Sequence, residues 1–232
     1  MKRIMLKLSG EALAGEKKTG FDEDTVRGVA LQVKQLVDDG MEVGIVIGGG
    51  NFWRGRTSKN IDRTKADQIG MLATIMNCIY VSEIFRSVGM DTNILTPFEC
   101  GSFPKLFSKD RANKYFEKGM VVFFAGGTGH PYFSTDTPAV VRAAEIGADV
   151  VLMAKNIDAI YTADPRKDPS AQKISEITYK EILARGLAAM DSTATSFAME
   201  NNLPIHVFGL DKSENIYNVI MGAKMGTVVK GE

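Results

Sequence analysis

Val43-Gly44-Ile45-Val46-Ile47-Gly48-Gly49-Gly50-Asn51 is a β-branched run that leads directly into three glycines. We predict a buried strand over 43–47 and, after it, a loop in which glycine permits positive φ and lets backbone N–H groups approach an anion. Arg54 follows three residues after Asn51 and adds a cation whose planar guanidinium matches a phosphate. The pattern therefore predicts an anion-binding loop at the end of a strand.

The same combination of a strand and glycines occurs twice more in the chain. Residues 4–8 (Ile-Met-Leu-Lys-Leu) run into Ser9-Gly10, which we interpret as a turn, and residues 121–125 (Val-Val-Phe-Phe-Ala) run into Gly126-Gly127-Thr128-Gly129. In open parallel sheets, ligands bind at the carboxyl ends of the strands. The three junctions predict several backbone-lined anion sites on one edge of a sheet, which favours phosphate chemistry.

Strand and helix patterns alternate along the whole chain. We predict a first helix from an N-cap at Asp22 to about Asp39, where Gly40 ends it. The alternation predicts an α/β protein, a three-layer αβα sandwich around a mainly parallel sheet that helices cover on both faces. Further strands are predicted at 93–95, 121–125, 150–154, 205–208 and 227–229, and further helices at 65–88, 108–118, 136–147, 178–185, 193–201 and 214–221.

The sequence contains no repeat, linker or low-complexity segment. We therefore predict a single domain over 1–232, with an N-terminal lobe of about 1–148 and a C-terminal lobe of about 149–232. The irregular stretch 156–177 contains two Asp-Pro pairs and is interpreted as a hairpin or a binding loop.

The chain has 232 residues, with 28 Lys and Arg against 28 Asp and Glu. This balance argues against general nucleic-acid or polyanionic membrane binding, which needs an excess of positive charge. The apolar runs look strand-sized, shorter than the roughly 20 residues of a membrane span, and Met1-Lys2-Arg3 leads into a strand without the features of a signal peptide. Cys78 and Cys100 are isolated, which argues against a disulfide framework and a structural zinc site. We expect a soluble cytoplasmic protein.

The predicted helix 65–88 is apolar on more than one face. One stripe at helical spacing contains Ile69, Leu72, Ala73, Met76, Ile79, Tyr80, Ile84 and Phe85, and a second set that widens it contains Met71, Ile75, Cys78 and Val81. Such a helix is either deeply buried or half of a subunit interface. Both interpretations stay open, and the second predicts a homo-oligomer in which the second set, including Ile75, faces a partner.

Two familiar nucleotide-binding motifs are absent from the sequence, which has neither a GxxxxGK[ST] loop nor a GxGxxG followed by a distant acidic residue. A prediction of nucleotide binding must therefore rest on the constellation of candidate residues. Lys7 is a lone cation within an apolar strand, just before Ser9-Gly10. It is either an edge-strand lysine or a cation held over a transferring phosphoryl group, with the Gly10 N–H as a further donor.

The segment 128–136 joins the third glycine junction to a predicted helix. Ser134, Thr135 and Asp136 are all good N-cap residues, and the same hydroxyls and helix-terminal amides suit a phosphate. His130 is interpreted as a packing or hydrogen-bonding residue rather than a general base, because a phosphate acceptor is already ionised.

Other candidate residues also have a simple structural alternative. Asp67 and Asp191 each lie near a predicted helix start, where carboxylates are common caps. Trp53 is interpreted as a lid over the glycine run. In the irregular stretch, Tyr161 is placed to flank a base and Asp164 to accept from a ribose hydroxyl, although a turn alone explains an Asp-Pro pair.

Taken together, these segments resemble the amino acid kinase superfamily, and most closely its bacterial uridylate (UMP) kinase family. The match covers essentially the whole chain and runs through Lys7-Leu8-Ser9-Gly10-Glu11-Ala12-Leu13, Ile47-Gly48-Gly49-Gly50-Asn51, Asp67 with Gly70-Met71-Leu72-Ala73-Thr74, Gly127-Thr128-Gly129, Pro131-Tyr132-Phe133-Ser134-Thr135-Asp136 and Tyr161-Thr162-Ala163-Asp164-Pro165. The first two motifs are shared with acetylglutamate, glutamate and carbamate kinases. The segments 70–74 and 131–136 look specific to uridylate kinases.

The resemblance implies a carbamate kinase-like fold and an ATP-dependent kinase. The implied reaction transfers the γ-phosphate of ATP to UMP, giving UDP and ADP, in pyrimidine nucleotide (CTP and UTP) biosynthesis. It also implies Mg²⁺ with ATP, and an allosteric homohexamer that GTP activates and UTP inhibits. The N-terminal lobe would hold the acceptor and the C-terminal lobe would hold ATP.

The resemblance also implies roles for single residues. Lys7 would act on the transferring group, and Asp191 would orient Lys7 and the groups beside Asn51. The implied ATP-binding set is Lys7, Leu8, Ser9, Gly10, Gly50, Arg54, Lys155, Asn156, Tyr161 and Asp164. The implied UMP-binding set is Gly49, Asp67, Thr128, Gly129, His130, Pro131, Tyr132, Phe133, Ser134 and Thr135, with Asp67 near the ribose. The place of the GTP-activation loop is taken by Gly15, Glu16, Lys17, Lys18, Thr19 and Gly20, and no residue is assigned as a direct metal ligand.

The sequence departs from the family pattern at two places. His130 stands where many relatives carry asparagine beside the uracil, and the stretch 155–158 is one residue shorter than in some relatives. The choice between Lys155 and Asn156 as the ATP contact therefore stays open. The alternative functions are another amino acid kinase, or a nucleotide- or oxyanion-binding protein without catalysis. The presence of Lys7, Asp164 and Asp191 argues against the second, because a binding protein does not need a catalytic lysine.

Overall fold

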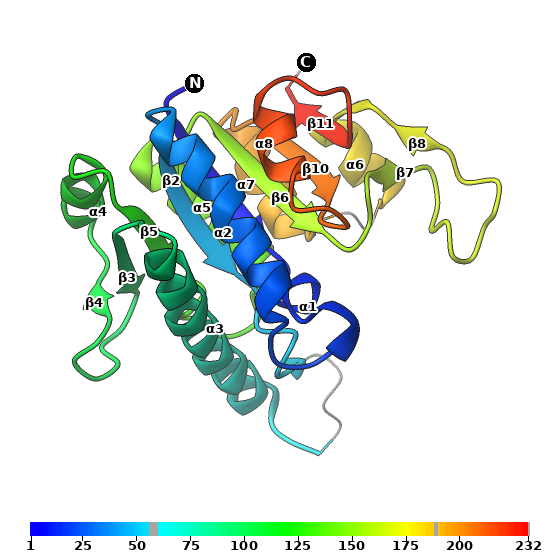
Figure 1. Ribbon diagram of the computed structural model, residues 1–232. Coiled ribbons are helices and arrows are strands. Elements are labelled where there is room, and N and C mark those ends of the chain that lie inside the picture. The colour runs from blue at the N-terminus through cyan, green and yellow to red at the C-terminus, as the bar shows by residue number, and fades with distance from the viewer. Residues whose placement is uncertain (56–59, 188–189, 232) are drawn as a thin grey trace.

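One sheet organises the computed structural model, which describes residues 1–55, 60–187 and 190–231 (Figure 1). In this part of the chain nine strands pair in the order β4-β3-β5-β2-β1-β6-β10-β11-β9. The neighbouring pairs are parallel except β10 with β11. The strands are β1 (Arg3–Leu8), β2 (Glu42–Ile47), β3 (Thr92–Thr96), β4 (Lys105–Leu106), β5 (Val121–Phe124), β6 (Val150–Lys155), β9 (Glu176–Thr178), β10 (Ile205–Gly209) and β11 (Thr227–Lys230).

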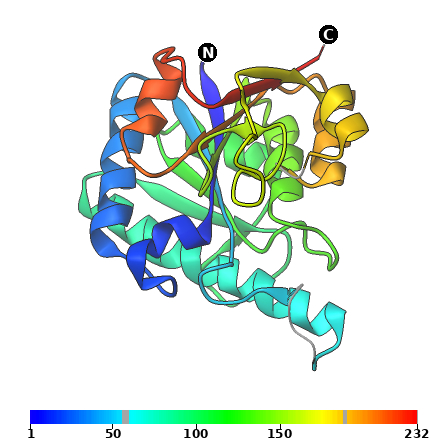
Figure 2. The ribbon, with the colours of Figure 1, turned by 90° about the vertical axis from the view of Figure 1, so that its right-hand side faces the viewer.

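Helices cover both faces of the sheet (Figure 1 and Figure 2). On one face lie α2 (Glu23–Asp38), α3 (Arg63–Ser87) and α8 (Asn215–Ile220), and on the other lie α4 (Lys109–Phe116), α5 (Asp136–Ile146), α6 (Tyr179–Arg185) and α7 (Ser192–Glu200). The buried apolar side chains accordingly form two cores, one on each side of the sheet. The predicted three-layer α/β architecture is confirmed.

Strand β1 lies in the middle of the sheet, between β2 and β6. Because side chains alternate along a strand, Ile4, Leu6 and Leu8 enter the core under α2 and α3, whereas Met5 enters the core under α5. Lys7 has the same parity as Met5 and therefore points toward the α5 side. The edge-strand interpretation of Lys7 is wrong, since β1 is paired on both of its edges.

Helix α2 shows how the sequence sets the helix boundaries. Asp22 caps α2 by accepting a hydrogen bond from the Thr25 N–H at 2.9 Å. Apolar residues at helical spacing from Val26 to Leu36 are buried against the sheet. Gly40, with a φ of 84°, follows the end of the helix as predicted.

The three strand–glycine junctions lie on one edge of the sheet, because β1, β2 and β5 are parallel and adjacent. Two details differ from prediction. Ser9-Gly10 is not a turn, since the helix α1 (Gly10–Leu13) begins directly after β1. Residues 48–51, which we call the glycine loop, contain no glycine with positive φ. Close packing favours glycine at Gly49 instead, because a Cβ there would lie 3.0 Å from the backbone oxygen of Gly70.

In helix α3 the exposed apolar side chains come from the first predicted stripe, and not from the second set that was predicted to face a partner. Ile75, Cys78 and Val81 are buried in the core, and the exposed apolar face belongs to the other stripe, with Leu72 at 51% and Met76 at 49% exposure. The helix is also long and apolar enough to cross a membrane by length and composition, contrary to the expectation from the sequence. One such helix is weak evidence of a membrane span, and nearly half of its apolar window is buried within the fold.

Several short elements escaped the sequence patterns because they are too short to show periodicity. These are α1, the 3-10 helix η1 (Gly15–Lys17), β4 and β9. The irregular stretch 156–177 contains a hairpin, in which β7 (Ile160–Tyr161) pairs antiparallel with β8 (Lys173–Ile174). This hairpin projects from the right-hand side of Figure 1. The hairpin interpretation is confirmed.

Candidate active site

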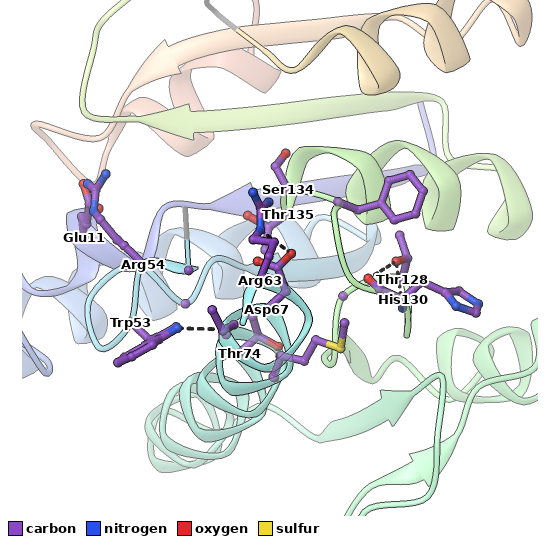
Figure 3. Close-up of a pocket in the computed structure, with 18 residues that line it drawn as sticks. Glu11, Trp53, Arg54, Arg63, Asp67, Thr74, Thr128, His130, Ser134 and Thr135 are labelled. Carbon is purple, nitrogen blue, oxygen red and sulfur yellow. Dashed lines mark hydrogen bonds and ion pairs between the residues drawn. The ribbon is translucent and has the colours of Figure 1, made fainter. Parts of the chain in front are cut away.

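A cavity of about 300 Å³ opens at the carboxyl edge of the sheet. Its walls come from α1, the glycine loop, the start of α3 and the residues that follow β5 (Figure 3). We call residues 128–135 the acceptor loop. Seven residues of the implied UMP set line this cavity, namely Gly49, Asp67, Thr128, His130, Phe133, Ser134 and Thr135. Gly50 and Arg54 of the implied ATP set line it as well.

Two lysines, of which Lys7 is buried and Lys155 is half-buried, share one carboxylate at this edge of the sheet. Lys7 Nζ lies 2.9 Å from Asp136 Oδ1, and Lys155 Nζ lies 2.9 Å from Asp136 Oδ2. Lys7 comes from β1, Lys155 from the end of β6, and Asp136 is the first residue of α5. We call these three residues the lysine cluster. The topology therefore brings together three residues that are distant in the sequence.

The lysine cluster has an excess of positive charge. Burial by itself would raise the pKa of Asp136, but the charges of Lys7 and Lys155 outweigh this effect and hold that pKa well below its usual range. Burial lowers the pKa of Lys155, and the charge of Asp136 opposes this shift. One carboxylate charge faces two ammonium charges, so the cluster is suited to stabilise an anionic group beside it.

Asp191 caps a helix beside the acceptor loop. Its carboxylate accepts from the Ala194 N–H at 2.7 Å, which makes Asp191 the N-cap of α7. The same carboxylate is hydrogen-bonded to Ser134 Oγ and Thr137 Oγ1. The residue against Lys7 is Asp136, which the sequence predicted only as a cap. The capping alternative for Asp191 is therefore confirmed, and its orienting role stays a prediction.

Asp67 joins α3 to the acceptor loop. It lies inside the helix, whose N-cap is Asp62, so the capping alternative for Asp67 is wrong. Asp67 Oδ2 pairs with Arg63 Nε at 2.8 Å and accepts from the Tyr132 N–H at 2.7 Å. Tyr132 has a φ of 73°, which is uncommon for a bulky residue, and the Arg63 guanidinium lies 5.4 Å from its ring centroid. Asp67 and Arg63 thus hold a strained loop residue at the cavity.

Thr74 connects α3 to the third glycine junction. Its Oγ1 accepts from the Gly126 N–H at 2.8 Å and donates to Met71 O at 2.7 Å. His130 lies on the acceptor loop, is exposed and lines the cavity, so it is not a packing residue. Its backbone N–H donates to Thr128 Oγ1 at 3.2 Å (Figure 3).

Glu11, to which we assigned no role from the sequence, contacts two residues of the implied ATP set. Its carboxylate pairs with Arg54, and its Oε2 lies 3.4 Å from Asn156 Nδ2. Asn156 is exposed there, whereas its neighbour Lys155 turns into the lysine cluster. Trp53 is not a lid over the glycine loop, because its Nε1 donates to Ala66 O at 2.8 Å and anchors the ring to α3 (Figure 3).

The remaining residues of the implied ATP set are spread along the same edge of the sheet. Tyr161 OH donates to Asp158 Oδ1 at 2.8 Å, and Asp164 pairs with Arg166 at 3.1 Å. Both residues belong to the β7–β8 hairpin, and neither is among the residues that line the cavity. Leu8 is buried, and the Ser9 N–H donates to Ala154 O at 3.3 Å. Across the described ranges, no group of three or more His, Cys, Asp or Glu side chains is placed to hold a metal ion.

Residues 15–20, the segment implied in GTP activation, are mostly exposed and are attached to the glycine loop. Thr19 Oγ1 donates to Asn51 O at 2.9 Å, and Asn51 Nδ2 donates to Gly20 O at 2.8 Å. A second cavity, of about 500 Å³, adjoins the segment between α2 and residues 210–214. The effector role of these residues stays a prediction.

A mainly parallel α/β fold with glycine junctions, a pair of lysines and a cavity at its carboxyl edge belongs to the class of proteins that bind anionic ligands at strand ends. The chain belongs to the amino acid kinase family, whose family model matches residues 2–209. The family resemblance seen in the sequence is thereby confirmed.

Solved structures of other proteins agree with this assignment. The UMP kinase from Bacillus anthracis is 34% identical with a TM-score of 0.95, and the match covers 100% of this chain and 96% of that one. The UMP kinase from Ureaplasma parvum is 35% identical with a TM-score of 0.92, covering 99% of this chain and 98% of that one. The uridylate kinase from Archaeoglobus fulgidus is 26% identical with a TM-score of 0.77, covering 99% and 100%.

Proposed function

We propose that this protein is a UMP kinase, which transfers the γ-phosphoryl group of ATP to UMP and so forms UDP and ADP. The observation that carries this proposal is the lysine cluster, in which the ammonium groups of Lys7 and Lys155 share one carboxylate at the carboxyl edge of the sheet. The adjoining cavity is lined by the glycine loop and the acceptor loop. The two bacterial structures named above, both described as UMP kinases, are similar over nearly the full chain.

Phosphoryl transfer to a phosphate requires positioned substrates and positive charge, but it does not require a general base. An ionised oxygen of the UMP phosphate attacks the γ-phosphorus, a new P–O bond forms, and the bond to the β–γ bridging oxygen breaks with its electron pair leaving on ADP. Lys7 and Lys155 stabilise the negative charge that spreads over the transferring group. ATP would enter as its Mg²⁺ complex, and the metal would neutralise part of the charge on the phosphates.

The two substrates would occupy different parts of this edge. The acceptor would lie in the 300 Å³ cavity of the N-terminal lobe, between Asp67 and the acceptor loop. ATP would lie toward the C-terminal lobe, between Lys155 and the hairpin that carries Tyr161 and Asp164. We place the enzyme in the cytoplasm, in the supply of pyrimidine nucleotides, with GTP and UTP as its effectors.

The proposal is tested by ADP release with UMP, CMP and N-acetylglutamate as separate acceptors. We expect rapid release with UMP only. Release with N-acetylglutamate instead would make the protein an amino-acid kinase of the same fold. Binding of UMP and ATP without any release of ADP would identify a nucleotide-binding protein without catalysis.

Substitution of Asp67 by alanine is expected to raise KM for UMP while KM for ATP stays near its wild-type value. The carboxylate is placed to contact the acceptor, and loss of a charged hydrogen bond costs about 1.5–3 kcal/mol, which is a roughly 10- to 100-fold change in KM. The measurement is steady-state kinetics with each substrate varied in turn. Asp62→Ala is the matched control, because Asp62 only caps α3. Equal changes in both KM values would contradict the proposed contact.

We also propose that the protein is a homo-oligomer, a hexamer, and that the exposed face of α3 lies in an interface. Leu72, Met76 and Ile79 lie on that face with exposures of 51%, 49% and 41%. Contiguous apolar patches of this kind mark interaction surfaces. The assignment replaces the face predicted from the sequence, which is buried.

Met76→Glu is expected to give a smaller species that is still folded, because it places a charge in the proposed interface. The adjacent residue provides a matched control, since Ile75 is 3% exposed and Ile75→Glu should abolish folding by burying an unpaired charge. Sedimentation velocity and circular dichroism distinguish the two results. A wild-type protein that sediments as a monomer at micromolar concentration would refute the oligomer.

A further inference from the structure

Two asparagine side chains form a reciprocal amide pair beneath the glycine loop. Asn77 Nδ2 donates to Asn51 Oδ1 at 2.7 Å, and Asn51 Nδ2 donates to Asn77 Oδ1 at 3.1 Å. Asn77 is completely buried and Asn51 is 2% exposed. Asn77 is a polar residue in the middle of the apolar helix α3, so its placement there requires an explanation.

The bonds of the pair fix how each amide is turned. Asn77 Nδ2 also donates to Gly48 O at 2.7 Å, and Asn51 Nδ2 also donates to Gly20 O at 2.8 Å. Because a carbonyl oxygen only accepts, both NH₂ groups must face these carbonyls. The pair can therefore adopt one arrangement only, and that arrangement holds Gly48 and Asn51, at the two ends of the glycine loop.

The pair also lies against the first strand–glycine junction. A Cβ on Gly10 would come within 2.2 Å of Gly48 O and 2.6 Å of Asn51 Oδ1, so the start of α1 packs directly on the same two residues. Gly10 stands three residues after Lys7. This packing fixes the position of the glycine loop relative to the start of α1, so the backbone N–H groups of both segments have a set arrangement near Lys7.

A role in helix stability alone does not explain why the Asn77 side chain is hydrogen-bonded to residues outside its own helix. A buried polar side chain in a helix can be satisfied by its own helix, as Ser82 is by Ile79 O at 3.4 Å in the same helix. The Asn77 side chain instead forms hydrogen bonds with Gly48 and Asn51. Helix α3 is thereby attached to the glycine loop through one residue.

We propose that Asn77, acting through Asn51, is a positioning residue for phosphoryl transfer, which sets the backbone of the glycine loop relative to Lys7 and α1. This inference rests on the proposed kinase activity. A glycine loop that is slightly displaced from its normal position still binds phosphate. It no longer aligns the transferring group with the attacking oxygen. The loss should therefore be in kcat rather than in KM.

The test uses Asn77→Asp, which keeps the shape of the side chain and removes the NH₂ donor. A carboxylate oxygen then faces Gly48 O and Asn51 Oδ1, and we expect kcat per folded molecule to fall by about tenfold or more while both KM values stay within about threefold of wild type. Ser82→Ala is the matched control, a buried polar residue of α3 whose bond stays within the helix. It should leave kcat unchanged.

Folding is followed by circular dichroism, since Asn77→Asp also buries an unpaired charge. If that variant fails to fold, Thr19→Val tests the position of Asn51 instead. Thr19 is exposed, and its Oγ1 donates to Asn51 O. It should lower kcat by about threefold, the effect of one hydrogen bond, without changing KM.

A kcat for the folded variant equal to that of Ser82→Ala would overturn the positioning role, whatever the loss of thermal stability. This result is distinct from failure of the proposed function. If the wild type releases no ADP with UMP, the kinase proposal fails and this inference fails with it. If the wild type is active and the Asn77 and Thr19 variants keep normal kcat, only the inference fails.

Discussion

Lys7→Ala is expected to lower kcat by about 10²-fold or more in a protein that is still folded. The Lys7 ammonium is buried, comes from the central strand and lies 2.9 Å from Asp136 Oδ1. Its removal deletes a preorganised positive charge from the edge of the sheet where the phosphoryl group would pass. The fold should survive, because Lys155 still pairs with the other oxygen of Asp136.

The measurement compares kcat from ADP release with the fraction of folded protein from circular dichroism. Lys34→Ala is the matched control, since Lys34 forms an exposed i,i+4 pair with Asp38 on α2. Such a pair contributes only about 0.3–0.5 kcal/mol, so this variant should keep normal kcat and nearly normal stability. Near-normal turnover in folded Lys7→Ala would instead make Lys7 a structural residue.

The parts of the fold that could be predicted are those with a local signal. The helix that starts after Asp22 has a cap, an apolar stripe and a terminal glycine, and its ends agree with the prediction. The strand over 43–47 and its glycines are equally local. Residues with a special local setting, such as Lys7 in an apolar strand, were also found.

The lysine cluster could not be completed from the sequence, because its members meet only in the folded sheet. In the sequence, Asp136 has only the features of a residue at a helix start, and Lys155 has only those of a residue at the end of a strand. Their contact depends on β1 lying beside β6 and on α5 beginning at the same edge. Glu11 escaped notice for the same reason, since its partners Arg54 and Asn156 come from other segments.

Helix α3 shows a different limit of sequence patterns. Both of its sides are apolar, so periodicity identifies a helix but cannot decide which side enters the core. The structure buries Ile75, Cys78 and Val81 and exposes Leu72 and Met76. One polar residue on the buried side, Asn77, was a usable signal, because a fully buried amide needs partners outside an apolar core.

Asp136→Asn is expected to lower kcat by about 10²-fold and to destabilise the fold by about 3–5 kcal/mol. The substitution keeps the shape of the side chain but leaves the buried ammonium group of Lys7 and the half-buried one of Lys155 without their shared counter-charge. The pKa of Lys155, which burial already lowers, should fall further without the opposing charge of Asp136. Lys155 then loses its proton at lower pH, so the alkaline limb of the kcat profile should move to lower pH. A loss of stability alone would not move this limb.

The same variant should change the dependence of stability on acid. The folded pKa of Asp136 is held below its usual range, and the unfolded pKa of an aspartate is about 3.9. The carboxylate therefore contributes stability above the unfolded pKa, and this contribution is lost as pH falls through the folded pKa. The difference in unfolding free energy between wild type and Asp136→Asn should be steady between about pH 5 and pH 7 and should shrink below about pH 4. Asp62→Asn, at the exposed cap of α3, is the control and should show no such change. A difference that persists undiminished into strong acid would mean that the charge of Asp136 is not what holds the two lysines.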